Sequence, residues 1–190
     1  MHVAQPPNIA KLQAISNRSR TVRAHGTAVG LPSDADMGNS EVGHNALGSG
    51  QVVVQGARLV DIALETGGMF SSEGWQHISQ AFEHNTLHMI GLLSDGGVHS
   101  RYDQVVLMLK GAVERGAKRV RLHVLTDGRD VPDGSSIQFL TQLDQELAAL
   151  NAAKGCDCAV ASGGGRMNVT MDRYEVSRSS AECQSQRIYD

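Results

Sequence analysis

The chain has 190 residues, of which 41% are hydrophobic and 19% are charged. This composition supports a folded core and argues against a disordered chain. The formal net charge of −3 argues against nonspecific nucleic-acid binding, so any anion site must come from a few well-placed arginines.

The N-terminal residues, Met1 to Pro7, lack the apolar segment of a signal peptide, and no apolar run in the chain reaches membrane-spanning length. The chain has 3 cysteines, an odd number that is typical of a reducing compartment. No nearby Cys or His completes a zinc set around Cys156 and Cys158. We therefore expect a soluble, cytoplasmic protein without membrane or nucleic-acid partners.

Small and polar residues surround Ser40 in the segment 37–44, Met-Gly-Asn-Ser-Glu-Val-Gly-His. The run from Val42 to Leu47 predicts a short helix with Ser40 at its N-terminus, where free N–H groups and the helix dipole favour an anion. This position suits a nucleophile that accepts a phosphoryl group, although a serine that only caps the helix is the alternative. Gly38 allows a close backbone approach. His44 shares the helix face, as hydrogen-bonding support or as a catalytic group.

Helix-like and strand-like patterns alternate from Phe70 onward. Apolar stripes predict helices around residues 75–82, 105–113 and 140–150. Short apolar runs predict strands at Leu87–Leu93, Val120–Leu125 and Ala159–Ala161. This alternation predicts an α/β fold with a mostly parallel sheet and flanking helices. His123 falls inside the second strand, and we expect it to be a packed or edge residue.

A glycine-bearing loop follows each predicted strand. In an open parallel sheet the carboxyl ends of the strands share one edge, where ligands bind. We therefore expect one site to gather four residues from these loops: His99, Arg129, Asp130 and Arg166. Each loop alone is ordinary turn chemistry, and Arg129 with Asp130 could be a local ion pair. Three such loops together favour a binding site.

From about Val22 to Tyr174, several motifs occur in the order found in one known family. They are the segment around Ser40, Leu92–Ser100, Asp127–Asp130 and Gly165–Arg173. In these motifs the chain resembles the cofactor-independent phosphoglycerate mutases of the longer, plant-like form, which belong to the alkaline-phosphatase-like superfamily.

The resemblance implies an isomerase of glycolysis and gluconeogenesis. It would interconvert 3-phosphoglycerate and 2-phosphoglycerate through a phosphoserine, without 2,3-bisphosphoglycerate, as a monomer. Ser40 would be the nucleophile and a ligand of two divalent metal ions, Mn²⁺ or Mg²⁺. Asp130 would exchange protons with the glycerate hydroxyls. The implied substrate-binding residues are His99, Arg129, Asp130, Arg166 and Arg173.

The resemblance also implies a division of the chain. Residues 1–54 would be a fragment of the metal-binding, phosphatase-like α/β domain, and residues 55–176 an incomplete substrate-binding (transferase) domain. Residues 177–190 diverge from the family and are expected to form a disordered tail. Because most of the first domain's sheet is missing, we expect Val29, Val42 and Leu47 to lack packing partners.

The chain departs from the family pattern in three respects. Residues 1–21 contain no Asp or Glu, although the family has an acidic metal ligand there. The later Asp and His ligands and a second pair of arginines are also missing, and Gln51 stands where the family usually has Arg. We therefore expect a fragment that is inactive alone. The alternatives are a non-catalytic phosphometabolite-binding module and a metal-dependent phosphatase that passes the phosphoryl group from Ser40 to water.

Overall fold

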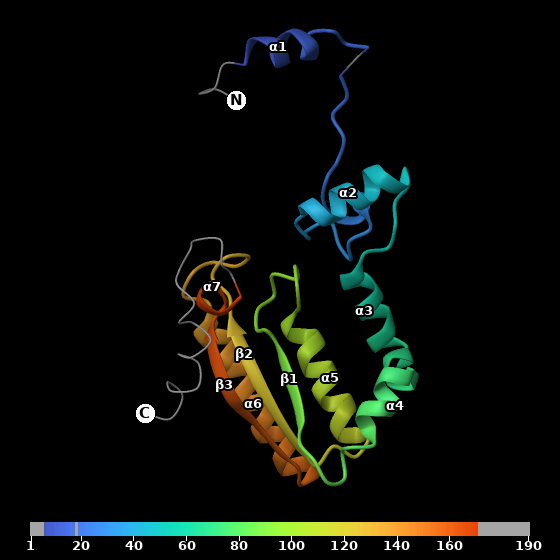
Figure 1. Cartoon of the computed structure of the whole chain (residues 1–190). Helices are drawn as coiled ribbons and strands as arrows, with labels where there is room; N and C mark the ends of the chain where they lie inside the picture. The colour runs from blue at the N-terminus through green and yellow to red at the C-terminus, as the bar shows by residue number, and fades with distance from the viewer. Residues whose placement is uncertain (1–5, 18, 171–190) are drawn as a thin grey trace. The chain divides into compact units, whose positions relative to one another are not determined.

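The structure is a computed structural model that describes residues 6–17 and 19–170. The chain divides into two compact units, residues 1–53 and residues 54–190. Figure 1 labels the helices and strands of both units, and each unit is described by itself below.

The first unit contains α1 (Pro7–Gln13), the 3₁₀ turn η1 (Gly26–Val29) and α2 (Ser40–Ser49). Its small core consists of Val29, Leu31 and Val42, each of which is at most 9% exposed. The expectation that Val29 and Val42 lack partners is therefore wrong, because the loop between η1 and α2 folds back and supplies them. Leu47, in contrast, is 83% exposed.

Hydrogen bonds close the loop that leads into α2. Gly26 N–H donates to the Asp36 carbonyl at 3.0 Å, and Thr27 N–H donates to Asp34 Oδ1 at 3.1 Å. The expected close approach at Gly38 is confirmed, since a Cβ there would lie 1.8 Å from the carbonyl oxygen of Ala24. Only glycine fits at this point, and the backbone crossing fixes where α2 begins.

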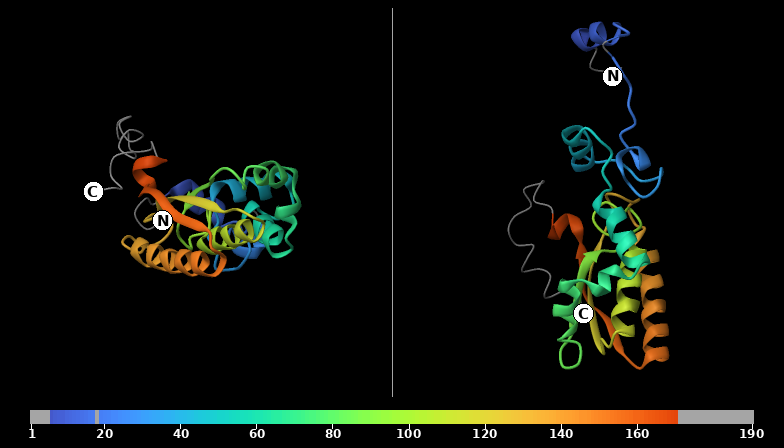
Figure 2. Two further views of the ribbon diagram at one scale, coloured as in Figure 1. Left: turned by 90° about the horizontal axis from the view of Figure 1, so that it is seen from below. Right: turned by 90° about the vertical axis from the view of Figure 1, so that its right-hand side faces the viewer.

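The second unit is built on a parallel sheet in the order β1 (Leu87–Leu92), β2 (Arg119–Thr126), β3 (Asp157–Gly165). The connections are α5 (Tyr102–Glu114) and α6 (Ser136–Lys154). Both helices lie on one face of the sheet (Figure 2), as right-handed crossovers between successive neighbouring strands require. The predicted α/β class with a parallel sheet and flanking helices is confirmed.

The main core lies between the sheet and these two helices. Leu109 of α5 and Leu143 of α6 are completely buried, as is Val120 of β2. The apolar stripes read from the sequence therefore face the sheet. The four-residue α7 (Arg166–Val169) follows β3 directly.

A helical segment precedes the sheet in the second unit. It comprises α3 (Gly56–Glu65), the 3₁₀ turn η2 (Gly68–Ser71) and α4 (Glu73–Ser79). The sequence predicts α4 but not α3. The N-cap residue of α3, Gln55, makes no side-chain capping hydrogen bond, and its C-cap residue is Thr66 and not a glycine. The position of α3 follows from contacts with α5 and η2.

Gly111 of α5 gives a test of this packing. A Cβ at Gly111 would lie 2.1 Å from Cζ of Phe70, whose ring meets Trp75 edge-on with centroids 4.8 Å apart. Gly111→Ala should therefore lower the free energy of unfolding by about 1–3 kcal/mol in a urea titration, although alanine is normally the better helix former. Gly74→Ala in α4 is the control, because a Cβ at Gly74 meets nothing within 4 Å. A Gly111→Ala protein as stable as the parent would contradict the close packing of Phe70 on α5.

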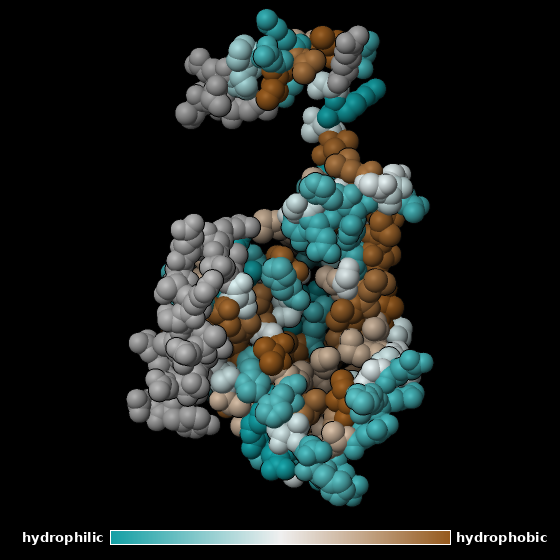
Figure 3. All heavy atoms as spheres, viewed as in Figure 1, coloured by the Kyte–Doolittle hydropathy of each residue, from teal (hydrophilic) through white to brown (hydrophobic). Residues whose placement is uncertain are grey.

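The other face of the sheet carries polar and apolar side chains. Ile90 of β1 is 75% exposed on this face, and hydrophobic surface is visible over α3 and in the middle of the strand face (Figure 3). In β3 a bulge leaves Ala161 unpaired, because Leu122 pairs with Val160 and the next residue, His123, pairs with Ser162. The bulge reverses the alternation of side chains, so Ser162 faces the same side as His123.

Among the helices of the described residues, none combines the length and the apolar composition that a membrane-spanning helix needs.

Candidate functional site

Ser40 is the first residue of α2, and its side chain is exposed. The helix cap is the preceding residue, Asn39, whose Oδ1 accepts the N–H of Val42 at 3.0 Å. The predicted helix start at Ser40 is confirmed. Because Asn39 caps the helix, the Ser40 hydroxyl is not needed for capping and is available for chemistry at the positive end of the helix dipole.

His44 contacts Ser40 one turn along the helix. Its Nδ1 lies 2.7 Å from the Ser40 carbonyl oxygen and 3.3 Å from Ser40 Oγ. The shorter contact requires a proton on Nδ1, which donates to the carbonyl, so the same nitrogen cannot accept the hydroxyl proton. In this arrangement His44 supports the helix and does not act as a base toward Ser40.

In the second unit, Asp127 organises the loop that follows β2. Its Oδ1 accepts the N–H groups of Gly128, Arg129 and Asp130 at 3.0, 3.0 and 3.1 Å. Its Oδ2 accepts a hydrogen bond from the hydroxyl group of Ser94 at 2.7 Å, and Ser94 lies in the loop that follows β1. The Asp127 side chain is only 1% exposed. This buried carboxylate thus links two of the three predicted loops.

Arg166 brings in the third loop. It is the first residue of α7, its side chain is 4% exposed, and its Nη1 donates to Asp127 Oδ1 at 3.0 Å and to Oδ2 of Asp130. The structure therefore places two of the predicted site residues, Asp130 and Arg166, in contact. The first loop also packs here, since a Cβ on Gly96 would lie 2.9 Å from Cβ of Asp130. Arg166 Nε is buried without a hydrogen-bond partner among the described residues.

The environment of this cluster shifts two pKa values. Burial alone would raise the pKa of Asp127, but hydrogen bonds from Ser94, from the loop N–H groups and from Arg166 outweigh it and lower the pKa to about 2. For Arg166, burial lowers the pKa, but the carboxylates of Asp130 and Asp127 outweigh it and raise the pKa above its ordinary value. Both side chains are therefore charged at neutral pH.

The lowered pKa of Asp127 predicts an acid-sensitive contribution to stability. A carboxyl group whose pKa is lower in the folded state than in the unfolded state stabilises the fold at pH values above its unfolded-state pKa. This contribution is lost as the pH falls through the folded-state pKa. With 3.8 as the ordinary pKa and about 2 in the fold, Asp127 should contribute about 2 kcal/mol above pH 4, and this should disappear toward pH 2. Urea unfolding at several pH values, followed by Trp75 fluorescence, should show this loss in the parent protein and a smaller one in Asp127→Asn. Equal pH dependence in both proteins would exclude the contribution.

The other predicted site residues in the described part of the chain, Arg129 and His99, do not take part in the contact between Asp130 and Arg166. Arg129 is exposed in the second loop. His99 is exposed on the first loop, where it lines a cavity of about 430 Å³ that residues of α3, α4, β1, α5 and β2 also line. The acceptors of Arg166 Nη1 are Asp127 and Asp130, and neither His99 nor Arg129 is one of them. Arg173 and the predicted tail, residues 177–190, lie outside the described residues.

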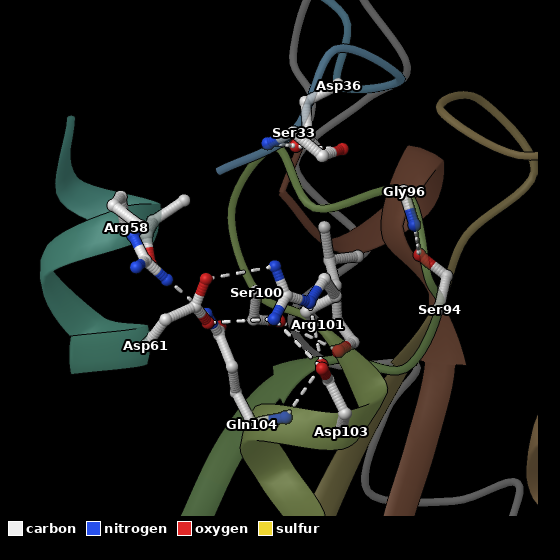
Figure 4. A network of polar contacts seen from close by, with 12 residues as sticks. Ser33, Asp36, Arg58, Asp61, Ser94, Gly96, Ser100, Arg101, Asp103 and Gln104 are labelled. Carbon is white, nitrogen blue, oxygen red and sulfur yellow. Dashed lines mark hydrogen bonds and ion pairs between the residues drawn. The ribbon is translucent and has the colours of Figure 1, made fainter. Parts of the chain in front are cut away.

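The first loop is anchored next to α5, as the close-up in Figure 4 shows. Ser100 Oγ donates to the Leu92 carbonyl at 2.7 Å. Arg101 donates from Nη2 to Asp61 of α3 and from Nε to Asp103, both at 2.7 Å. Asp61 is 7% exposed, and Gln104 also donates to it, at 2.8 Å. This network holds both ends of the segment that carries His99.

Sequence reasoning missed two groups of polar residues. Asp127 directly precedes Gly128, and Ser94 lies two residues before Gly96, so both occur in ordinary turn patterns. Only the hydrogen bond between these two residues, which are 33 positions apart, shows their role. On the strand face, His88 Nδ1 lies 2.8 Å from His123 Nε2, and His123 Nδ1 lies 2.5 Å from Ser162 Oγ. The sequence predicts only a packed or edge residue at His123. Register and the bulge in β3 create this chain of contacts, and neither can be read from spacing.

The implied metal ions require a set of ligands. Among residues 6–17 and 19–170, no group of three or more His, Cys, Asp or Glu side chains is placed to hold a metal ion. Divalent ions of this kind need several oxygen or nitrogen ligands. A two-metal centre therefore does not fit the described residues by themselves.

Comparison with known proteins gives consistent results. Residues 60–182 match the family described as the BPG-independent PGAM N-terminus. The chain is 62% identical over 176 residues to the 2,3-bisphosphoglycerate-independent phosphoglycerate mutase of Mesembryanthemum crystallinum, covering 92% of this chain and 31% of the relative. It is 59% identical over 184 residues to the enzyme of the same name from Trypanosoma brucei brucei, covering 96% of this chain and 33% of the relative.

A solved structure, Leishmania mexicana phosphoglycerate mutase at low cobalt concentration, superposes with a TM-score of 0.85 and 56% identity, covering 95% of this chain and 33% of the other. The chain thus spans about a third of the length of these relatives. The matching family, the relatives and the common fold agree, and the chain belongs to the family of 2,3-bisphosphoglycerate-independent phosphoglycerate mutases.

Proposed function

We propose that this chain supplies the nucleophile segment and part of the substrate domain of a phosphoglycerate mutase. The reaction is the interconversion of 3-phosphoglycerate and 2-phosphoglycerate, a step of glycolysis and gluconeogenesis. The observation that carries the proposal is the contact of Arg166 with Asp130 and Asp127 at the carboxyl ends of the strands, in a chain that is 62% identical to a named mutase.

In this proposal the arginines recognise the substrate. A guanidinium group presents paired N–H donors that match a phosphate or a carboxylate, and phosphoglycerate carries one of each. Arg166 is held by two carboxylates, and Arg129 is exposed in the loop that follows β2. His99 and Arg173 complete the proposed set. The loop glycines allow the backbone to approach the ligand closely.

Two groups carry the chemistry. Ser40 accepts the phosphoryl group as a phosphoserine, and the start of α2 stabilises the added negative charge. Asp130 takes a proton from the glycerate hydroxyl that attacks the phosphoserine and returns a proton to the hydroxyl that is released. The transfer is then reversible between the two hydroxyl groups without 2,3-bisphosphoglycerate.

The proposal includes two divalent metal ions, with Ser40 as one ligand. The Leishmania mexicana structure was obtained at low cobalt concentration, which is consistent with a divalent-metal enzyme. The other ligands would come from sequence that the longer relatives carry outside the matched third. We also propose that the complete enzyme acts as a monomer in the cytoplasm, the compartment in which glycolytic phosphoglycerate is formed.

The test uses a hybrid enzyme, namely the Mesembryanthemum crystallinum relative in which residues 22–174 of this chain replace the matching segment. The hybrid is incubated with 3-phosphoglycerate and divalent metal, and the products are followed by ³¹P NMR. Formation of 2-phosphoglycerate with little free phosphate is expected. Dominant release of phosphate would favour a phosphatase. Binding of 3-phosphoglycerate without turnover would favour a non-catalytic binding module.

A further inference from the structure

One nitrogen atom of Arg166 donates hydrogen bonds to two carboxylates. Its Nη1 donates both to Oδ1 of Asp127 and to Oδ2 of Asp130. The three side chains carry one positive and two negative charges in a place where all are 12% exposed or less. Because charge-assisted hydrogen bonds are strong at such sites, the position of the guanidinium group depends on both carboxylates.

Asp127 is held much more firmly than Asp130. It accepts hydrogen bonds from Ser94, from three consecutive loop N–H groups and from Arg166. These bonds keep it ionised, with a pKa of about 2. Asp127 is therefore a fixed negative charge that competes with Asp130 for the same guanidinium group.

Removing that charge would change the partner of Arg166. The guanidinium group would then have one carboxylate, Asp130, and a planar Arg–carboxylate pair tends to become bidentate. A bidentate pair would occupy both oxygens of Asp130 and stabilise its ionised form. Such a carboxylate is a poorer proton acceptor and is less accessible to a substrate hydroxyl.

We propose that Asp127 is a positioning residue, which divides Arg166 between two carboxylates and so keeps Asp130 free to exchange protons with the substrate. The inference rests on the proposed function, because it gives Asp130 its task in the mutase reaction. It adds a residue that touches neither substrate nor metal and acts through Arg166 and the loop that carries Asp130.

Asp127→Asn is the decisive variant, because it preserves shape. The amide oxygen can still accept the three loop N–H groups, and the Ser94 hydroxyl can turn to accept from the amide NH₂. Two controls accompany it. Ser94→Ala removes one hydrogen bond and leaves the charge of Asp127 in place. Asp133→Asn makes the same chemical change at an exposed position of the same loop, where Oδ1 accepts the N–H of Gly134.

The first measurement needs no turnover. Arg166 Nε–H is buried and unpartnered among the described residues, so in the chain as it stands it should give a slowly exchanging ¹⁵N–¹H NMR signal. Asp127→Asn should shift this signal strongly, because a neutral amide oxygen binds the guanidinium group more weakly than a carboxylate does and the group turns toward Asp130. Both control variants should leave the signal nearly unchanged. An Arg166 signal that stays in place in Asp127→Asn would overturn the proposal, whether or not the hybrid is a mutase.

The second measurement is kinetic, in the hybrid enzyme. Asp127→Asn should lower kcat by about 10–100-fold and change KM by less than about threefold, since substrate contacts remain while proton exchange suffers. The two controls should stay within about threefold of the parent in both constants. Near-UV circular dichroism checks that all variants are folded.

The outcomes separate the two ideas. An active parent hybrid with an unchanged kcat in Asp127→Asn would overturn the positioning role and leave the proposed function standing. A parent hybrid without mutase activity would overturn the proposed function, and with it the kinetic part of this inference. A rise in KM alone would assign Asp127 to substrate binding and contradict the positioning role.

Discussion

Replacing Ser40 by alanine should lower mutase turnover of the hybrid enzyme by at least about 1,000-fold, because the phosphoryl group then has no acceptor. The change should cost little stability. Ser40 is exposed, and the cap of α2 is provided by Asn39, whose Oδ1 accepts the Val42 N–H. Binding of 3-phosphoglycerate, measured by calorimetry, should remain close to the parent value, since the proposed substrate contacts lie on other residues.

The matched control is Ser49→Ala at the other end of the same helix. Ser49 Oγ donates to the Asn45 carbonyl at 2.7 Å, so its loss is a comparable change in local hydrogen bonding without the proposed chemistry. Ser49→Ala should keep nearly full turnover. Rapid quenching of the parent with ³²P-labelled 3-phosphoglycerate should also trap label on the protein, and Ser40→Ala should trap none. Normal turnover in Ser40→Ala would remove Ser40 from the mechanism.

The sequence predicts the sheet of the second unit well, because each of its elements carries a strong local signal. The stripes that include Leu109 in α5 and Leu143 in α6 each have a clear helical period, and both residues are completely buried. The parallel order follows from the alternation of strands and helices. In α3, apolar residues such as Leu59 and Ile62 remain exposed and no cap marks the ends, so tertiary contacts and not local signals establish the helix.

The cluster around Arg166 was predictable only in part. Strand order brings the three loops to one edge, so the nearness of Asp130 and Arg166 could be foreseen. The role of Asp127 could not, because an Asp before Gly most often serves its own turn. Here it does so through three loop N–H groups and also binds Arg166 and Ser94 from distant loops. Local spacing does not reveal such a combination.

The pairing of His88 with His123 illustrates a different limit. The two residues are 35 positions apart, and their contact depends on the register of β1 with β2, in which Ile90 pairs with His123. The contact to Ser162 depends in addition on a bulge, and a one-residue shift would have turned Ser162 to the opposite face. The first unit gives a similar lesson, since loop closure and not strand pairing buries Val29 and Val42.

Arg129 and Asp130 are neighbours in sequence, but they should respond differently to conservative changes in the hybrid enzyme. Arg129→Lys keeps the charge and loses the planar pair of donors, so KM for 3-phosphoglycerate should rise about tenfold or more while kcat changes little. Asp130→Asn keeps the shape and an oxygen that can accept from Arg166 Nη1, but it cannot take up a proton. Its kcat should therefore fall by about 100–10,000-fold with a smaller change in KM.

Steady-state kinetics of both variants, with the folded fraction checked by circular dichroism, measures this contrast. Arg129 is exposed and lysine keeps its charge, whereas Asp130 is mostly buried and its partner Arg166 keeps Asp127 as a counter-charge. Both variants should thus fold. A rise in KM alone for both would reduce Asp130 to a substrate-binding residue, and the proton exchange would have to be assigned to another group. A large loss of kcat in Asp130→Asn, with no such loss in Arg129→Lys, would support the role of Asp130 as the acid–base group, because the variant keeps the shape and the contact with Arg166 and removes the capacity to exchange a proton.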